Sequence, residues 1–205
     1  MKKFFHDYSY SMVKMFVNQF AISIFGVSLT FATTQAHMGS DGLDVFTLIV
    51  SLFSTVFYLF LIYTLSWELG SKDRVSVDSG RKPYRSCTGL LISLVANIPN
   101  ILAAVLYLVA TLIRSEEMLF IVRLVASLMQ GMYFGTITAV SLPVGAGGAF
   151  VQLNALWPTF FVMVIPALIT SWIAYVLGYK NIKILAFLSE KNKDDDGKDH
   201  PQIKN

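Results

Sequence analysis

The stretch Val45 to Trp67, "VFTLIVSLFSTVFYLFLIYTLSW", is a continuous apolar run without a charged side chain. A helix needs about 20 such residues to cross the roughly 30 Å of hydrocarbon in a bilayer. Tyr63 and Trp67 lie near its end, where aromatic side chains favour the membrane interface. The run therefore predicts a membrane-spanning helix.

The rest of the chain has the same character, with 55% hydrophobic and only 14% charged residues, whereas soluble domains average about 25% charged. The other apolar stretches that we expect to be membrane helices are Met12 to Thr34, Leu90 to Ile113, Met118 to Leu142, and about Thr159 to Val176. The sequence therefore predicts an all-α, polytopic transmembrane bundle of about five helices in one domain, residues 1–185. The charged tail, residues 186–205, is predicted to be disordered.

Basic residues indicate the orientation, because lysine and arginine are retained on the cytoplasmic side of a membrane. Lys2, Lys3 and Lys14 flank the first helix. The polar segment 68–89 adds five more basic residues, namely Lys72, Arg74, Arg81, Lys82 and Arg85. We therefore expect the N-terminus and segment 68–89 to be cytoplasmic. Basic clusters of this kind also attract anionic lipid headgroups, so these five residues are predicted lipid contacts.

The C-terminal tail leaves two arrangements open. Five crossings would place its lysines outside, against the charge rule. Alternatively, the segment Met118 to Pro158 enters from the outside, breaks around Gly131 to Gly148 and returns as a re-entrant segment, which leaves the tail inside. We expect five crossings, and the re-entrant arrangement is the alternative.

Polar side chains inside membrane helices are costly, so each one is a candidate for function. We expect a ligand-binding cavity between the third helix and the glycine-rich segment "LPVGAGGAFVQLNALWP", Leu142 to Pro158. Its predicted lining residues are Asn97, Asn100, Arg123, Gln130, Gln152 and Asn154. The alternative is that the amides bridge helices and that Arg123 snorkels to the headgroups or pairs with Glu116 or Glu117. Asn18 and Gln19 are interpreted as lying near the inner interface.

Two further patterns concern the helices themselves. Pro99, in "NIPN", lacks an amide hydrogen and is expected to kink the third helix near its middle. Gly131 and Gly135 form the GxxxG of "GMYFG", which lets two helices approach closely. This motif predicts helix packing, within the chain or against a partner.

Motifs of known chemistry are missing from the sequence. It contains no HExxH, no GxSxG and no Walker loop, and its three histidines are scattered. Cys87 is the single cysteine, so neither an internal disulfide nor a CxxC site is available. We expect a protein that is not an enzyme and has no cofactor, no metal site and no nucleic-acid partner.

Three stretches carry a resemblance to known proteins: "WELGSKDR" (Trp67 to Arg74), "GLLISLVANIPN" (Gly89 to Asn100) and "LGYKNIKIL" (Leu177 to Leu185). They resemble segments of small uncharacterised polytopic membrane proteins of low-GC Gram-positive bacteria, over about a quarter of the chain. The resemblance implies a bacterial cytoplasmic membrane protein, with segment 68–89 and "GYK" at the cytoplasmic face. It implies no activity and no site residues.

Two functions follow as hypotheses. In the first, the protein is a non-enzymatic membrane protein that serves as a small-solute transporter component or solute-binding subunit. In the second, it is an accessory or scaffold subunit that packs against a larger membrane complex, or against a second copy, through "GMYFG" and the basic segment. A transporter predicts a polar cavity that reaches the midplane, whereas a scaffold predicts closed packing inside and an apolar, small-residue face outside.

Overall fold

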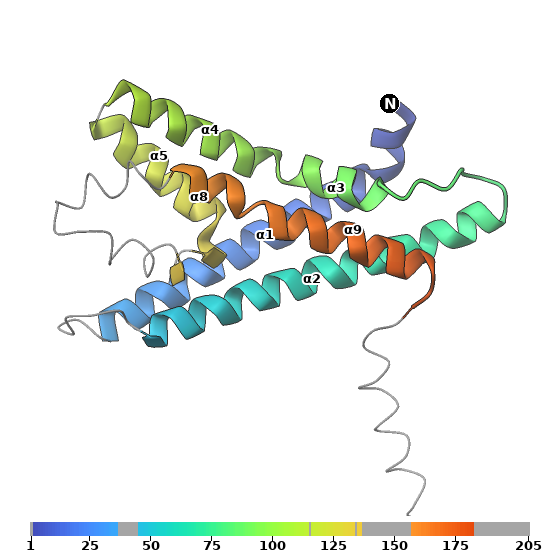
Figure 1. The fold of residues 1–205 in the computed structure, drawn as a ribbon, viewed down its shortest axis with the longest axis horizontal. Coiled ribbons are helices and arrows are strands. Elements are labelled where there is room, and N and C mark those ends of the chain that lie inside the picture. The colour runs from blue at the N-terminus through green and yellow to red at the C-terminus, as the bar shows by residue number, and fades with distance from the viewer. Residues whose placement is uncertain (1, 37–44, 115, 134, 137–156, 183–205) are drawn as a thin grey trace, which may run out of the picture.

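The computed structural model describes residues 2–36, 45–114, 116–133, 135–136 and 157–182 (Figure 1). Its elements are α1 (Lys2–Ala36), α2 (Val45–Asp78), α3 (Thr88–Ala96), α4 (Ile98–Ile113), α5 (Glu116–Met129), the short 3-10 helix η1 (Gly131–Tyr133), α8 (Trp157–Val162) and α9 (Ile165–Tyr179). No strand occurs in these ranges. The predicted all-α helical bundle is therefore confirmed.

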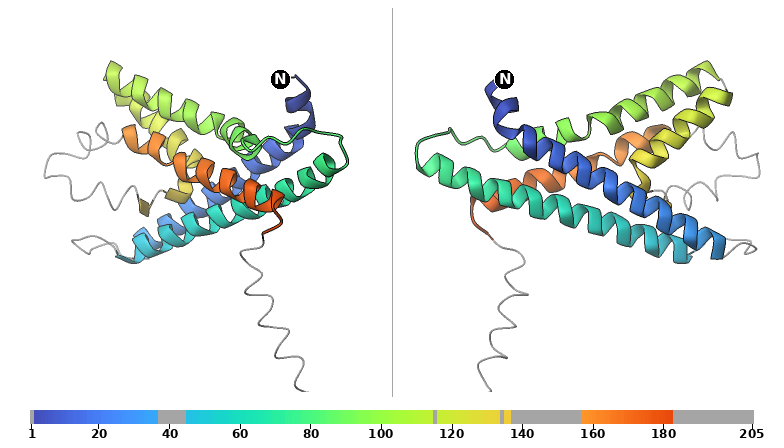
Figure 2. Two further views of the ribbon diagram at one scale, coloured as in Figure 1. Left: turned by 45° about the vertical axis from the view of Figure 1, so that its right-hand side comes forward. Right: turned by 180° about the vertical axis from the view of Figure 1, so that it is seen from behind.

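Helices α1 and α2 are the long elements of the bundle and run antiparallel, as Figure 2 shows from two sides. Both extend beyond the predicted apolar stretches. Helix α1 begins at Lys2 and not near Met12, and α2 continues past Trp67 to Asp78. Much of the polar segment 68–89 is thus helix, because no proline or glycine pair interrupts it before Gly80.

Helix α9 packs closely along the C-terminal half of α2. A side chain at Gly70 would collide with the backbone of Tyr175, and one at Gly178 would collide with the backbone of Trp67. The glycines of the two helices therefore allow backbone-to-backbone contact, as small residues do in membrane bundles.

The third predicted helix is present as two pieces, α3 and α4, that meet at a bend of 52°. The bend lies at Asn97, and Pro99 stands in the first turn of α4, where its missing amide hydrogen costs nothing. The kink expected at "NIPN" is therefore found at that sequence. Helix α4 then ends at Arg114, which adopts a left-handed backbone conformation with φ 57°, and α5 returns alongside it.

The fourth apolar stretch differs from the prediction of one helix from Met118 to Leu142. Helix α5 has 14 residues and ends at Met129, followed by η1. At 1.5 Å per residue, α5 is about 21 Å long, too short to cross about 30 Å of hydrocarbon. The prediction of a continuous fourth span is wrong within the described residues, because Gly131 turns the chain against α1.

Three helical segments are long and apolar enough to cross a membrane, namely Phe4–Thr33, Val45–Asp78 and Trp157–Tyr179, and the bent pair α3–α4 makes a fourth if it counts as one span. The bundle therefore has three or four spans of this kind in its described part, not five. The N-terminus and the end of α9 lie toward the same end of the bundle (Figure 1). Contacts support this placement: the hydroxyls of Tyr8 on α1 and Tyr175 on α9 both donate to Asp73 Oδ2, at 2.7 and 2.9 Å. The choice between five crossings and the re-entrant arrangement stays a prediction, because residues 137–156 and the tail lie outside the described residues.

Candidate functional site

A buried cluster of amide side chains surrounds the bend between α3 and α4. Asn97 is its centre: its Oδ1 accepts a hydrogen bond from Gln19 Nε2 on α1 at 3.1 Å and one from Asn100 Nδ2 at 2.9 Å. Its own Nδ2 donates to the Ser93 carbonyl at 2.8 Å. All three amide side chains are at most 3% exposed. We call Gln19, Ser93, Asn97 and Asn100 the central cluster.

Gln19 joins this cluster although its sequence position suggested the inner interface. The predicted place of Gln19 near the inner interface stays a prediction. The residue lies within the apolar Phe4–Thr33 segment of α1 and is 2% exposed. Its amide must therefore find partners inside the bundle.

The end of α5 lies one turn further along α1. The Ser23 hydroxyl donates to the carbonyl of Leu128 at 2.6 Å and contacts the amide of Gly131. Gly131 packs on Ser23 and Val27, and Gly135 packs on Ser51 of α2. The GxxxG of "GMYFG" thus faces helices of the same chain.

Gln130 connects α5 to α8. Its Nε2 donates to the carbonyl of Phe160 at 3.0 Å, and the residue is 1% exposed. The Tyr58 and Tyr133 rings lie nearby in the same core, in an edge-on contact at 6.2 Å between centroids.

Several polar atoms in this region have no hydrogen-bond partner among the described residues. They are the Oε1 atoms of Gln19 and Gln130 and the hydroxyls of Tyr58 and Tyr133. Each unpaired buried polar group costs about 1–3 kcal/mol. A bundle selected only for packing would be more stable with apolar side chains here, so the unpaired groups mark this region as a candidate site.

The remaining predicted lining residues, Arg123, Gln152 and Asn154, are not among the described residues of the central cluster. Arg123 is half-buried on α5, and no ion pair joins it to the described Glu117. In the described residues, no hydrogen bond or ion pair joins Arg123 to the central cluster. Gln152 and Asn154 lie outside the described residues. The structure therefore brings together Asn97 and Asn100, with Gln130 in the adjoining core, and leaves Arg123 apart.

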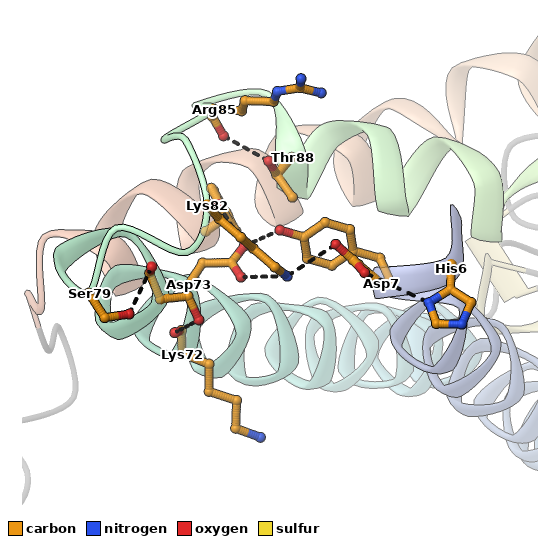
Figure 3. Close-up of polar contacts among 11 residues, drawn as sticks. His6, Asp7, Lys72, Asp73, Ser79, Lys82, Arg85 and Thr88 are labelled. Carbon is orange, nitrogen blue, oxygen red and sulfur yellow. Dashed lines mark hydrogen bonds and ion pairs between the residues drawn. The ribbon is translucent and has the colours of Figure 1, made fainter. Parts of the chain in front are cut away.

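A second polar cluster lies at the end of the bundle that holds the N-terminus. Asp73, 5% exposed, accepts hydrogen bonds at Oδ2 from the hydroxyls of Tyr8 (2.7 Å) and Tyr175 (2.9 Å). The Lys82 ammonium lies 3.9 Å from Asp73 Oδ1 and 3.7 Å from Asp7 Oδ2 (Figure 3), and 4.5 Å from the centre of the Tyr8 ring. We call these five residues the end cluster.

Hydroxyl groups continue from the end cluster into the bundle. The Ser66 and Ser171 hydroxyls lie 2.9 Å apart, and Ser171 donates to the Gly89 carbonyl at 2.9 Å. The Ser93 hydroxyl, in the central cluster, donates to the Ala167 carbonyl at 3.4 Å. Polar side chains thus follow the line along which α2, α3 and α9 meet.

The end cluster borders an open pocket of about 160 Å³. Its lining residues are Phe4, Asp7, Tyr8, Arg81, Lys82, Pro83, Arg85 and Thr88. They come from the start of α1, the connection after α2 and the start of α3.

Sequence reasoning missed the end cluster. No local pattern pairs Asp73 with Tyr8 or Tyr175, since these residues lie 65 and 102 positions away in the sequence. No group of three or more histidine, cysteine, aspartate or glutamate side chains in the described residues could hold a metal ion. No protein-family model, curated protein or solved structure matches the chain, so the resemblance to small bacterial membrane proteins stays a prediction.

Proposed function

We propose that the protein is a small-solute-binding or transport component of a membrane, and that its solute passes or binds beside the central cluster. The observation that carries this proposal is the position of the unpaired polar atoms. Gln19 Oε1 belongs to the residue that bonds with Asn97 at the bend, and Gln130 Oε1 belongs to the residue directly after α5; both are buried without a partner among the described residues.

Helix breaks at this depth support the proposal. A bent α3–α4 pair and a helix that ends inside the bundle place backbone and amide side chains among apolar helices. Transporters use discontinuous helices near the bilayer midplane in this way, because the freed polar groups can bind solutes or ions. The polar groups in this region are neutral amides and hydroxyls. The proposed solute is therefore small, polar and uncharged.

The accessory-subunit hypothesis has less support. Gly131 and Gly135 face α1 and α2 of the same chain, so the motif that suggested a partner is already used. Such a subunit would have to bind its partner through another surface.

Solvent access to the central cluster tests the proposal. Ser93→Cys, in a Cys87→Ser background, replaces a fully buried hydroxyl of the cluster by a thiol of similar size. The matched control is Ala104→Cys, also fully buried but in the apolar core. The probe is 2-aminoethyl methanethiosulfonate, applied to purified protein in proteoliposomes.

We expect the thiol at position 93 to react at least tenfold faster than the thiol at position 104, because a solute path must admit a small polar reagent. Swelling of the same vesicles in gradients of glycerol and urea, with and without the reagent, then tests passage. Equal protection of both thiols would contradict the proposal and favour a closed accessory subunit.

A further inference from the structure

The five basic residues of segment 68–89 are not equivalent in the structure. Lys72 Nζ lies 2.6 Å from Glu68 Oε1, and Arg74 Nε lies 3.6 Å from Asp78 Oδ2, each one helical turn away on α2. Lys82 is held between Asp7 and Asp73. Three of the five charges therefore already have carboxylate partners.

Arg81 and Arg85 are the other two, and neither side chain has an ion pair or hydrogen bond among the described residues. Both line the pocket beside the end cluster. Lys82 lies at the same pocket between Asp7 and Asp73, so these three groups together carry one negative charge. Arg81 and Arg85 add two positive charges, so the charge around the pocket is net positive by one.

The start of α3 adds to this positive potential. Thr88 lines the pocket as the first residue of α3, and the preceding Cys87 side chain makes no capping hydrogen bond. Helix N-termini carry a partial positive charge and favour anions. The start of α3 and both arginine residues therefore border the same pocket.

The chemistry of these groups selects the ligand. A guanidinium group presents planar, forked donors that match the oxygens of a phosphate, often two at a time. The pocket also has apolar walls, Phe4 and Pro83, and the neighbouring Phe5 is 47% exposed. Such a combination accommodates a phosphate that carries an apolar or glycerol substituent.

We propose that this pocket is a binding site for a phosphate group, held by Arg81 and Arg85 at the N-terminus of α3. Its place at the end of the bundle suits the headgroup of an anionic phospholipid, and free phosphate shares the same chemistry. The site is separate from the central cluster and does not depend on the proposed transport function.

The test compares two double variants that lose the same charge. Arg81→Gln with Arg85→Gln removes the arginines of the pocket. Lys72→Gln with Arg74→Gln is the matched control, because these residues lie in the same segment but do not line the pocket. Native mass spectrometry of the full chain in non-ionic detergent, titrated with dioleoyl phosphatidylglycerol, measures the lipid bound, and phosphatidylcholine is the zwitterionic comparison.

We expect the unsubstituted chain and the control to retain one phosphatidylglycerol, and the pocket variant to bind it about 30-fold more weakly, from about 1 kcal/mol per charge. Arg81→Lys with Arg85→Lys, which keeps the charge but not the forked donors, should lie between them. Thermal unfolding of each variant checks that it is folded.

The source of the phosphate is distinguished by sodium phosphate in the absence of lipid. If it raises the melting temperature of the unsubstituted chain but not of the pocket variant, relative to chloride of equal ionic strength, the site accepts free phosphate. If only phosphatidylglycerol does so, the ligand is the lipid headgroup. Equal losses of phosphatidylglycerol affinity in the two double variants would overturn the proposal, since binding would then reflect total charge. No loss of affinity in the pocket variant would overturn it as well, since the two arginines would then not hold the lipid.

Discussion

Asp73 shows how one side chain can join distant parts of a membrane protein. Its carboxylate accepts hydrogen bonds from Tyr8 on α1 and Tyr175 on α9, and it lies close to Lys82 in the connection to α3. A buried carboxylate is stabilised only when such partners are present. Asp73 therefore holds three segments together at one end of the bundle.

Substitution of Asp73 by alanine should lower the free energy of unfolding by about 3 kcal/mol, because two buried hydroxyls and Lys82 lose their acceptor. The measurement is an SDS titration of the purified protein in mixed micelles. Asp78→Ala is the control, since Asp78 is exposed and pairs only with Arg74 on the surface, which is worth about 0–1 kcal/mol. Equal effects of the two substitutions would mean that Asp73 is not a structural centre.

Asn97 has the corresponding role in the middle of the bundle. A double-mutant cycle with Gln19→Ala and Asn97→Ala should give a coupling free energy of about 0.6–1.7 kcal/mol, the range found for hydrogen bonds between membrane helices. The comparison cycle pairs Asn18→Ala with Asn97→Ala, since Asn97 bonds with Gln19, Ser93 and Asn100 and not with Asn18 in the structure. If this coupling free energy is no larger than that of the comparison cycle, the result contradicts a stabilising hydrogen bond between Gln19 and Asn97.

Among the helices, the contact between α2 and α9 depends most on small residues. Gly70 and Gly178 lie against the backbone of the opposite helix, so the helix axes are as close as the backbones permit. This contact brings Tyr175 to Asp73 and Ser171 to Ser66. The packing of these two helices therefore determines where the end cluster forms and where Ser66 and Ser171 pair.

Gly178→Leu should consequently destabilise the protein by about 1–3 kcal/mol or more, because the added side chain meets the Trp67 backbone, which cannot move aside. Ser28→Leu adds the same side chain at an exposed position of α1 and should change the unfolding free energy by less than about 0.5 kcal/mol. Circular dichroism during thermal unfolding in detergent measures both. A Gly178→Leu protein as stable as the control would show that α9 does not pack this closely.

Across the bundle, the arrangement of the helices determines which chain ends lie together. The connection between α2 and α3 and the end of α9 lie toward one end, and the end of α4 lies toward the other (Figure 1). A single membrane-impermeant maleimide, applied to intact cells, can therefore report on the whole topology.

We expect Cys87, and Lys180→Cys in a Cys87→Ser background, to be protected in intact cells and labelled after permeabilisation. Arg114→Cys in the same background should be labelled from outside. All three positions are exposed, so packing does not limit the reaction. Labelling of position 180 but not of Cys87 in intact cells would contradict the expectation that both positions lie on the same side of the membrane. It would support five crossings instead.

Much of this architecture can be predicted from local sequence. Apolar length predicts α2 and the span that ends in α9, and the proline of "NIPN" predicts the bend, because solvation by lipid and the missing amide hydrogen act over a few residues. The same reasoning selected Asn97, Asn100 and Gln130 as unusual polar residues. It could not rank them against Arg123, since their partners lie on other helices.

Only the tertiary structure decided the ends of α1, the early end of α5 and the pairing of Asp73 with Tyr8 and Tyr175. Each depends on contacts between residues far apart in the chain: Gly131 stops α5 against Ser23, and the glycines of α2 and α9 bring the end cluster together. Hydropathy indicates whether a helix is more stable in lipid or in water, and this depends only on the residues of that segment. The partner of each buried polar group depends on how the helices pack, and a linear pattern does not contain that information.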